Sequence, residues 1–140
     1  MRVKPIVYVA GPYRSVGGEW GTTENIRAAE TFALGLWRRG AVAICPHKNT
    51  AYFGGAAPDE VWLEGDLELV KVSDALLLVP GWMESIGTRV EFKLAVSIGL
   101  TVFDFAQDIK DTWMLVEKWV WRWRRDHGLE QEDDALCGSV

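Results

Sequence analysis

Residues 72–105, VSDALLLVPGWMESIGTRVEFKLAVSIGLTVFDF, contain the pattern that decides the fold. Two short apolar runs, Ala75–Val79 and Thr101–Phe105, flank a segment with helical spacing at Ile86–Ile98. Strands that are apolar on both faces and separated by a helix are typical of a parallel sheet covered on both sides. This stretch therefore predicts one strand–helix–strand unit of an α/β domain.

The same alternation extends towards the N-terminus. Apolar runs at Ile6–Ala10 and Ala41–Cys45 predict two more strands, and helical patterns at Glu24–Arg38 and Asp59–Val72 predict the connecting helices. Right-handed crossovers then give an α/β, flavodoxin-like or Rossmann-like doubly wound parallel sheet of four to five strands with helices on both faces. We expect one domain over residues 1–127 and a disordered acidic tail over residues 128–140.

Composition limits the classes of function. The 140 residues are 49% hydrophobic, which fits a single domain with a sizeable core. The 15 basic and 20 acidic residues give a formal charge of -5, which argues against binding a nucleic acid polymer. Cys45 and Cys137 indicate neither a disulfide framework nor a zinc site, so we expect no metal and no cofactor. No apolar run reaches the length of a membrane span or a signal peptide, which predicts a cytoplasmic protein without membrane contacts.

Glu91 is the residue that demands an explanation. Helical stepping places it in the middle of an apolar stripe made by Gly87, Leu94, Ala95 and Ile98, while Arg89 and Lys93 point away. Burying an unpaired carboxylate is costly, so a ligand or a partner has to compensate.

A second carboxylate repeats this anomaly. In VWLEGDLELVKV, Asp66 lies at the edge of the stripe formed by Leu63, Leu67 and Val70, and the preceding Gly65 weakens the helix locally. Both helices follow strands, and in such sheets ligands bind beyond the carboxyl ends of the strands. Two carboxyl groups converging there suit cleavage of a glycosidic bond, in which one attacks carbon and the other handles a proton. Alone, the pair leaves sugar, nucleoside and phosphate chemistry open.

Three segments, VYVAGPYR, GDLELVKVSDALLLVPGW and SIGTRVEFKLAVSIG, resemble the signature segments of the nucleoside 2-deoxyribosyltransferase superfamily. That superfamily includes 2-deoxynucleoside 5-monophosphate N-glycosidases. The resemblance implies that Glu91 is the nucleophile or transition-state stabiliser, that Asp66 handles the proton, and that Tyr8 orients Glu91. It also implies that Ser85 opens the substrate-binding turn with Gly87 and Thr88, where a helix N-terminus favours an anion.

Two departures leave the substrate open. Pro12 stands where the monophosphate hydrolases have a serine, and it offers neither a hydroxyl nor an N–H group. Arg14 and Ser85 remain as candidate phosphate ligands, next to Gly11. The transferases, in turn, close the neighbouring site with a specific terminal residue, and the terminal DALCGSV shows no match to it.

Weaker candidates lie on the other loops at the same edge. His47 and Asn49 are candidates for sugar or base contacts, although a histidine in a loop more often makes a structural hydrogen bond. Trp82 and Trp20 are candidates for stacking on a base, with loop packing as the alternative. Asp74 either joins the site or caps or pairs with a neighbouring loop.

The last helical segment, from Asp111, holds four tryptophans on more than one face: Trp113, Trp119, Trp121 and Trp123. This excess of aromatic surface is either an ordinary core helix or a subunit interface, and we expect a homodimer or a higher homo-oligomer.

These observations predict an enzyme that cleaves the N-glycosidic bond of a (2-deoxy)nucleoside or nucleoside 5-monophosphate through a retaining carboxylate mechanism. Water as acceptor makes it a hydrolase, and a second base makes it a transferase. One alternative is a non-catalytic nucleotide-binding or sensing module. Another is a flavodoxin-like domain that acts through protein contacts of its tryptophan-rich helix.

Overall fold

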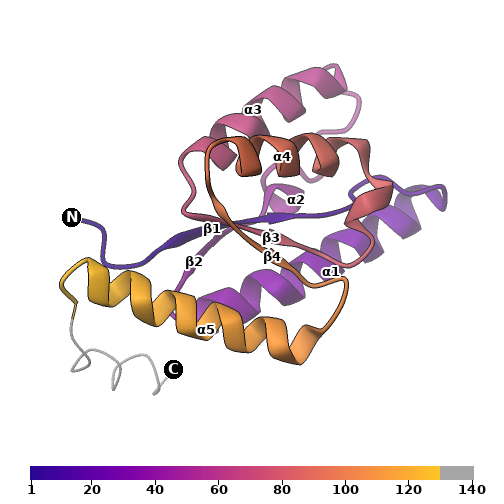
Figure 1. Cartoon of the computed structure of the whole chain (residues 1–140). Helices are drawn as coiled ribbons and strands as arrows, with labels where there is room; N and C mark the ends of the chain where they lie inside the picture. The colour runs from indigo at the N-terminus through magenta and orange to yellow at the C-terminus, as the bar shows by residue number, and fades with distance from the viewer. Residues whose placement is uncertain (130–140) are drawn as a thin grey trace.

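The computed structural model describes residues 1–129, and Figure 1 shows a sheet between two layers of helices. The strands are β1 (Ile6–Ala10), β2 (Val42–Ile44), β3 (Ala75–Leu78) and β4 (Thr101–Asp104). The helices are α1 (Gly18–Arg38), α2 (Pro46–Asn49), α3 (Asp59–Lys71), α4 (Ile86–Ser97) and α5 (Ile109–Asp126), and a 3-10 turn, η1 (Trp82–Glu84), precedes α4. The predicted tail lies outside the described residues from residue 130 onward.

The sheet confirms the predicted α/β class. Its four strands are all parallel in the order β2-β1-β3-β4, so β1 pairs with β2 on one side and with β3 on the other. The chain reverses its direction of winding between β1 and β3, which is the switch point where ligands bind in flavodoxin-like sheets. Helices α3 and α4 cover one face and α1 and α5 the other (Figure 1).

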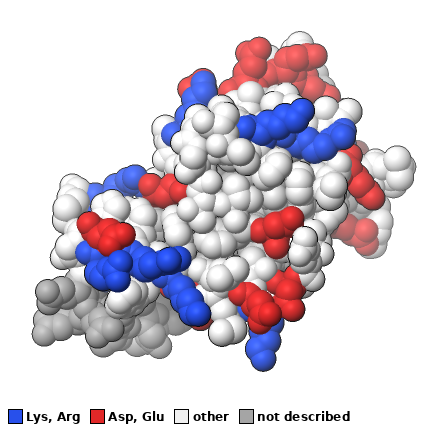
Figure 2. Space-filling model, viewed as in Figure 1, with Lys and Arg blue, Asp and Glu red and all other residues white. Residues whose placement is uncertain are grey.

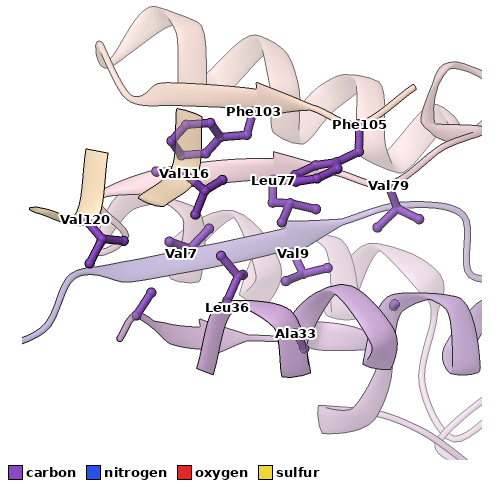
Figure 3. Packing of buried hydrophobic residues seen from close by; sticks show 13 residues of the cluster. Val7, Val9, Ala33, Leu36, Leu77, Val79, Phe103, Phe105, Val116 and Val120 are labelled. Atoms are coloured by element: carbon purple, nitrogen blue, oxygen red, sulfur yellow. The ribbon is translucent and has the colours of Figure 1, made fainter. Parts of the chain in front are cut away.

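Strand β1 separates two hydrophobic cores. Val7 and Val9 point towards α1 and α5, where they pack with Leu36, Leu77 and Val116 (Figure 3). Because side chains alternate along a strand, Tyr8 and Ala10 point to the opposite face, into the core beneath α3 and α4. This alternation places the one polar side chain of β1 on the face that carries both predicted carboxylates.

Several predicted boundaries were wrong. Helix α1 begins at Gly18 instead of Glu24, so Trp20 lies on a helix, 76% exposed, and its indole donates to Glu24. The segment after β2 was predicted as a loop, but it starts with the short α2, which Pro46 favours as the first helical residue. Helix α5 begins at Ile109 because the Asp108 carboxylate caps the amide of Asp111.

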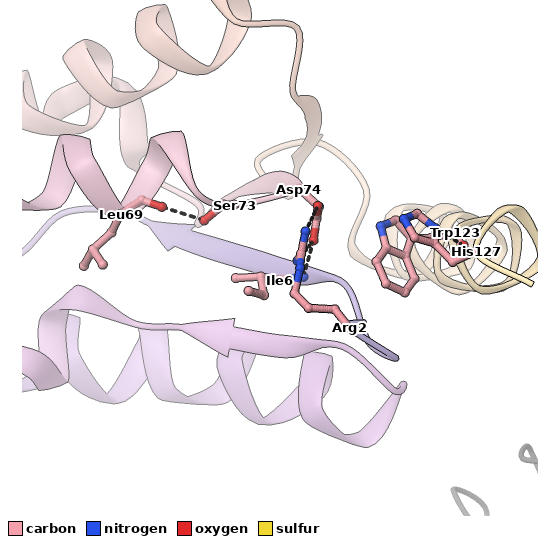
Figure 4. Close-up of polar contacts among 7 residues, drawn as sticks. All are labelled: Arg2, Ile6, Leu69, Ser73, Asp74, Trp123 and His127. Atoms are coloured by element: carbon pink, nitrogen blue, oxygen red, sulfur yellow. Dashed lines mark hydrogen bonds and ion pairs between the residues drawn. The ribbon is translucent and has the colours of Figure 1, made fainter. Parts of the chain in front are cut away.

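Asp74 lies at the amino edge of the sheet, away from the carboxyl ends of the strands. Its carboxylate accepts from both terminal nitrogens of Arg2, at 2.6 and 3.0 Å, and from the Ile6 amide at 2.7 Å (Figure 4). These contacts confirm the predicted pairing role, and the Arg2 hydrogen bond opposes the effect of burial and holds the Asp74 pKa below its ordinary value. Nearby, Trp123 stacks on His127 with ring centroids 3.7 Å apart.

The tryptophans of α5 are covered by their own chain more fully than the sequence suggested. Trp113 packs against Phe32 and Phe105 and carries the Arg39 guanidinium 4.1 Å above its ring. Trp119 meets Phe103, and Trp123 is 9% exposed. Of the four, Trp121 alone remains strongly exposed, at 43%.

Two helical glycines provide a test of this packing. A Cβ on Gly35 would come within 2.5 Å of the Trp113 ring, which its neighbours hold in place, whereas a Cβ on Gly65 would meet nothing within 4 Å. We expect Gly35→Ala to lower the free energy of unfolding by about 1–3 kcal/mol through overpacking. Gly65→Ala should raise it by up to about 1 kcal/mol through helix propensity.

Urea denaturation of both variants measures the two effects. An unchanged or more stable Gly35→Ala protein would show that Trp113 is free to move.

Candidate functional site

Glu91 lies on the inner face of α4, as predicted. Its side chain is 7% exposed, Ala95 is fully buried one turn later, and Arg89 and Lys93 face solvent. The stripe was wrong at its far end, because Ile98 is the C-cap residue and is 46% exposed.

The start of α4 is fixed by Ser85. Its hydroxyl oxygen accepts from the Thr88 amide at 3.2 Å and from the Thr88 hydroxyl at 3.0 Å, which satisfies one free helix N–H group. Thr88 is buried, and a Cβ on Gly87 would touch Leu63 of α3 at 3.9 Å. The three residues of the predicted turn therefore position the helix that carries Glu91.

Tyr8 and Glu91 meet directly beneath α4. The Tyr8 hydroxyl donates a hydrogen bond to Glu91 Oε2, although 83 residues separate the two positions. Burial, together with the nearby Glu91 and Asp66 carboxyls, raises the pKa of Tyr8 far above its ordinary value, so the phenol stays protonated. Tyr8 is thus a fixed donor to the glutamate.

Both carboxyl groups are held towards their neutral forms. Burial raises the pKa of Glu91 to about 8, the nearby Asp66 carboxyl adds to the rise, and the Tyr8 hydrogen bond opposes it. Asp66 is half-buried on α3, and burial raises its pKa to about 6. No Lys or Arg of the described residues contributes to either pKa. The structure therefore brings Tyr8, Asp66 and Glu91 together without a compensating cation, an arrangement typical of functional carboxyl groups.

His47, on α2, is held against the loop after β1 at the carboxyl edge of the sheet. It is 6% exposed, its Nε2 lies 2.7 Å from the Pro12 carbonyl oxygen, and its ring meets Tyr13 edge-on at 5.7 Å. Burial lowers its pKa, so the ring is neutral at pH 7 and Nε2–H donates to Pro12. This is the structural hydrogen bond that the sequence left as an alternative, and it fixes the segment that contains Pro12 and Arg14.

The remaining candidates separate into structural and exposed positions. Gly11 is required by packing, because a Cβ there would lie 2.8 Å from Val79 Cβ. Trp82 is 8% exposed, packs on Phe92 at 5.0 Å and donates from its indole to Asp104, which is the loop-packing alternative. Asn49 is exposed at the end of α2.

The sequence reasoning missed the partner of Arg14. The Arg14 guanidinium pairs with Asp59 at 2.6 Å, joining the loop after β1 to the first turn of α3. Acidic residues in a first helical turn are common, because they favour the helix dipole. Asp59 therefore gave no signal of a particular partner.

Residues 1–129 show neither a metal-binding cluster nor a helix able to span a membrane. These residues contain no cluster of three or more His, Cys, Asp or Glu side chains with the geometry to hold a metal ion. Over the same range, no helix combines the length and apolar character that crossing a bilayer requires.

Residues 5–104 match the sequence profile of a family described as Domain of unknown function (DUF4406). The matched range contains all four strands and α1 to α4, together with Tyr8, Asp66 and Glu91. It ends before α5. A search of curated protein sequences returned no match.

The raised pKa of Glu91 predicts a pH dependence of stability. The folded chain binds the Glu91 proton more tightly than the unfolded chain, in which the pKa is about 4.5. This contribution to the free energy of unfolding therefore falls as pH rises from about 4.5 to about 8, and it is constant above that range. We expect Glu91→Gln to remove this decline, so that the variant gains stability relative to the parent across the window.

Urea denaturation between about pH 5 and pH 9 measures the difference. Glu64→Gln, at an exposed carboxylate of α3, is the control and should follow the parent curve. Parallel curves for Glu91→Gln and the parent would show that Glu91 titrates as in the unfolded chain.

Proposed function

We propose that this chain, which belongs to the DUF4406 family, cleaves the N-glycosidic bond of a (2-deoxy)nucleoside or nucleoside 5-monophosphate. The observation that carries the proposal is the buried Glu91 carboxyl, which receives the Tyr8 hydrogen bond and lies near Asp66, with no Lys or Arg of residues 1–129 contributing to its pKa. The resemblance to nucleoside 2-deoxyribosyltransferases supports it, because the same three residues match that superfamily's catalytic positions.

The proposed reaction has two steps. The Glu91 carboxylate attacks the anomeric carbon of the sugar as the bond to the base breaks, and Asp66 delivers a proton to the leaving base. The resulting sugar ester on Glu91 is then attacked by water or by a second base, and Asp66 takes up the proton of the incoming nucleophile. The first acceptor makes the protein a hydrolase and the second a transferase, both with retention of configuration.

The two carboxyl groups supply the required number of protons near neutral pH. Between the Asp66 pKa of about 6 and the Glu91 pKa of about 8, the pair holds one proton and one negative charge. In the free site the proton favours Glu91, whereas the reaction needs it on Asp66 or on the base. The Tyr8 hydrogen bond lowers the Glu91 pKa and so favours the ionised form that attacks.

The leading alternative is a nucleotide-binding or sensing module of the same fold. Such a module needs contacts to its ligand, but it does not need a proton shared between the buried Glu91 and the half-buried Asp66. Two such carboxyl groups lower the stability of the fold, and a binding module has no reaction that would require them.

A cytoplasmic location stays a prediction.

The catalytic roles predict a separation of turnover from folding. Glu91→Gln and Asp66→Asn should each lower base release by orders of magnitude, because each removes a group that acts on the reacting atoms. Nucleoside binding should change little in both variants, and neither should melt at a lower temperature than the parent, because each replaces a carboxyl group whose pKa is raised by burial. Chromatography of the released base, calorimetric titration and thermal melting measure the three quantities.

Mass spectrometry of acid-quenched parent protein provides a second readout, since a sugar ester should be found on the peptide that contains Glu91. Unchanged base release per folded molecule, together with a large fall in melting temperature, would show that these acids only support the fold.

We also propose that the chain forms a homodimer or a higher homo-oligomer through α1 and α5. Both helices keep large apolar side chains in solvent, with Trp37 51%, Leu115 55% and Trp121 43% exposed. The ion pair between Arg39 and Glu117, at 3.0 Å, holds the two helices beside each other. Exposed aromatic side chains next to arginines are enriched at interfaces.

Light scattering at micromolar concentration should give a mass above the 15.7 kDa of one chain. Trp121→Glu should shift the protein towards the monomer, whereas Trp20→Glu, at the far end of α1, serves as the control. A monomeric parent protein would refute the proposal.

A further inference from the structure

The ion pair between Arg14 and Asp59 lies on the same face of α3 as Asp66. Seven residues separate Asp59 from Asp66, which brings the helix back to within about 20° of the same direction, about 10 Å along its axis. Both partners are exposed, with 63% and 65% of their side-chain surface open. The Arg14 guanidinium is therefore held at the start of α3, two turns from the carboxyl pair.

The loop that carries Arg14 is itself fixed. His47 donates to the Pro12 carbonyl, and the Asn25 side chain donates to the Tyr13 carbonyl at 3.1 Å. These two hydrogen bonds anchor the residues immediately before Arg14. The direction of the arginine is thus set by the backbone on one side and by Asp59 on the other.

The other cations near this edge are engaged or turned away. Lys48, which follows β2, pairs with Glu30 at 2.8 Å. Arg89 and Lys93 are exposed on the outer side of α4, and Figure 2 shows basic side chains across α4 and acidic ones gathered above, over α3. The Ser85 hydroxyl oxygen already accepts two hydrogen bonds from Thr88. An anion at the start of α4 would therefore meet uncharged donors, such as the backbone N–H groups of the first helical turn.

A phosphate monoester would add about 1.5 to 2 negative charges to this acidic neighbourhood. Because the Arg14 charge is cancelled by Asp59, the phosphate would be repelled by the negative charge that Asp66 and Glu91 share near neutral pH. It would also disfavour ionisation of Glu91, the form that attacks the sugar. A neutral nucleoside carries neither penalty.

Building on the proposed function, we infer that Asp59 is a specificity-determining residue. It holds the Arg14 guanidinium and cancels its charge, so that the site accepts uncharged 2-deoxynucleosides in preference to their 5-monophosphates. Exposed ion pairs contribute little free energy, so the effect of Asp59 is a modest factor in specificity and decreases as salt is added.

The test compares kcat/KM for base release from each 2-deoxynucleoside and its 5-monophosphate at low ionic strength. The parent protein should prefer the nucleosides. Asp59→Asn should raise the ratio of monophosphate to nucleoside kcat/KM by about two- to fivefold, and added salt should reduce the gain. Replacing Arg14 by Ala in the Asp59→Asn protein should abolish the gain.

Glu60→Gln is the matched control, because it removes one exposed carboxylate from the same helical turn and leaves the Arg14–Asp59 pair intact. It should keep the parent ratio. A parent protein that prefers monophosphates, or an Asp59→Asn ratio equal to that of Glu60→Gln, would overturn the inference and leave the glycosidase proposal standing. Absence of base release from every nucleoside and monophosphate would reject both.

Discussion

The alternation of side chains along β1 is the constraint on which the rest of the structure depends. This strand is paired on both sides, so each of its residues has to point into one of two helix layers. Val7 and Val9 fill the layer under α1 and α5, and Tyr8 is thereby forced into the layer under α3 and α4. A shift of register by one residue would exchange the two sets and bury the phenol among aliphatic side chains.

The polar group in that second layer offsets only part of the cost of burying Glu91. Tyr8 offers Glu91 a donor, but one neutral hydrogen bond does not repay the cost of burying a carboxylate, and the pKa of Glu91 stays raised. Asp66 increases the cost rather than reducing it. Most of the other buried side chains of the described residues are apolar, and the proposed glycosidase reaction supplies a reason for accepting this cost at one place.

Most of the candidate residues at the carboxyl edge of the sheet already have partners within the chain. His47, Trp82 and Gly11 serve the fold itself. His47 donates to the loop after β1, Trp82 donates to Asp104 at the end of β4, and Gly11 allows close packing on Val79. Arg14 and Ser85 are exposed or half-buried, and both already have partners in the chain. Under the proposed function, the electrostatic potential near the carboxyl pair therefore depends on whether a ligand breaks the Arg14–Asp59 ion pair or the Ser85–Thr88 hydrogen bonds.

The sequence by itself determined a parallel sheet of four to five strands, the long helices between the strands, the place of Ser85 at a helix N-terminus and the inward direction of Glu91. These features follow from local periodicity and capping, which a single stretch of chain contains. The family resemblance suggested that Tyr8 meets Glu91, but only the tertiary structure decided the other contacts: Arg14 with Asp59, His47 with Pro12 and Trp113 against Gly35. Each of these pairs joins segments at least 35 residues apart. Their contacts arise from how the helices and loops pack on the sheet, and no local pattern in the sequence records that packing.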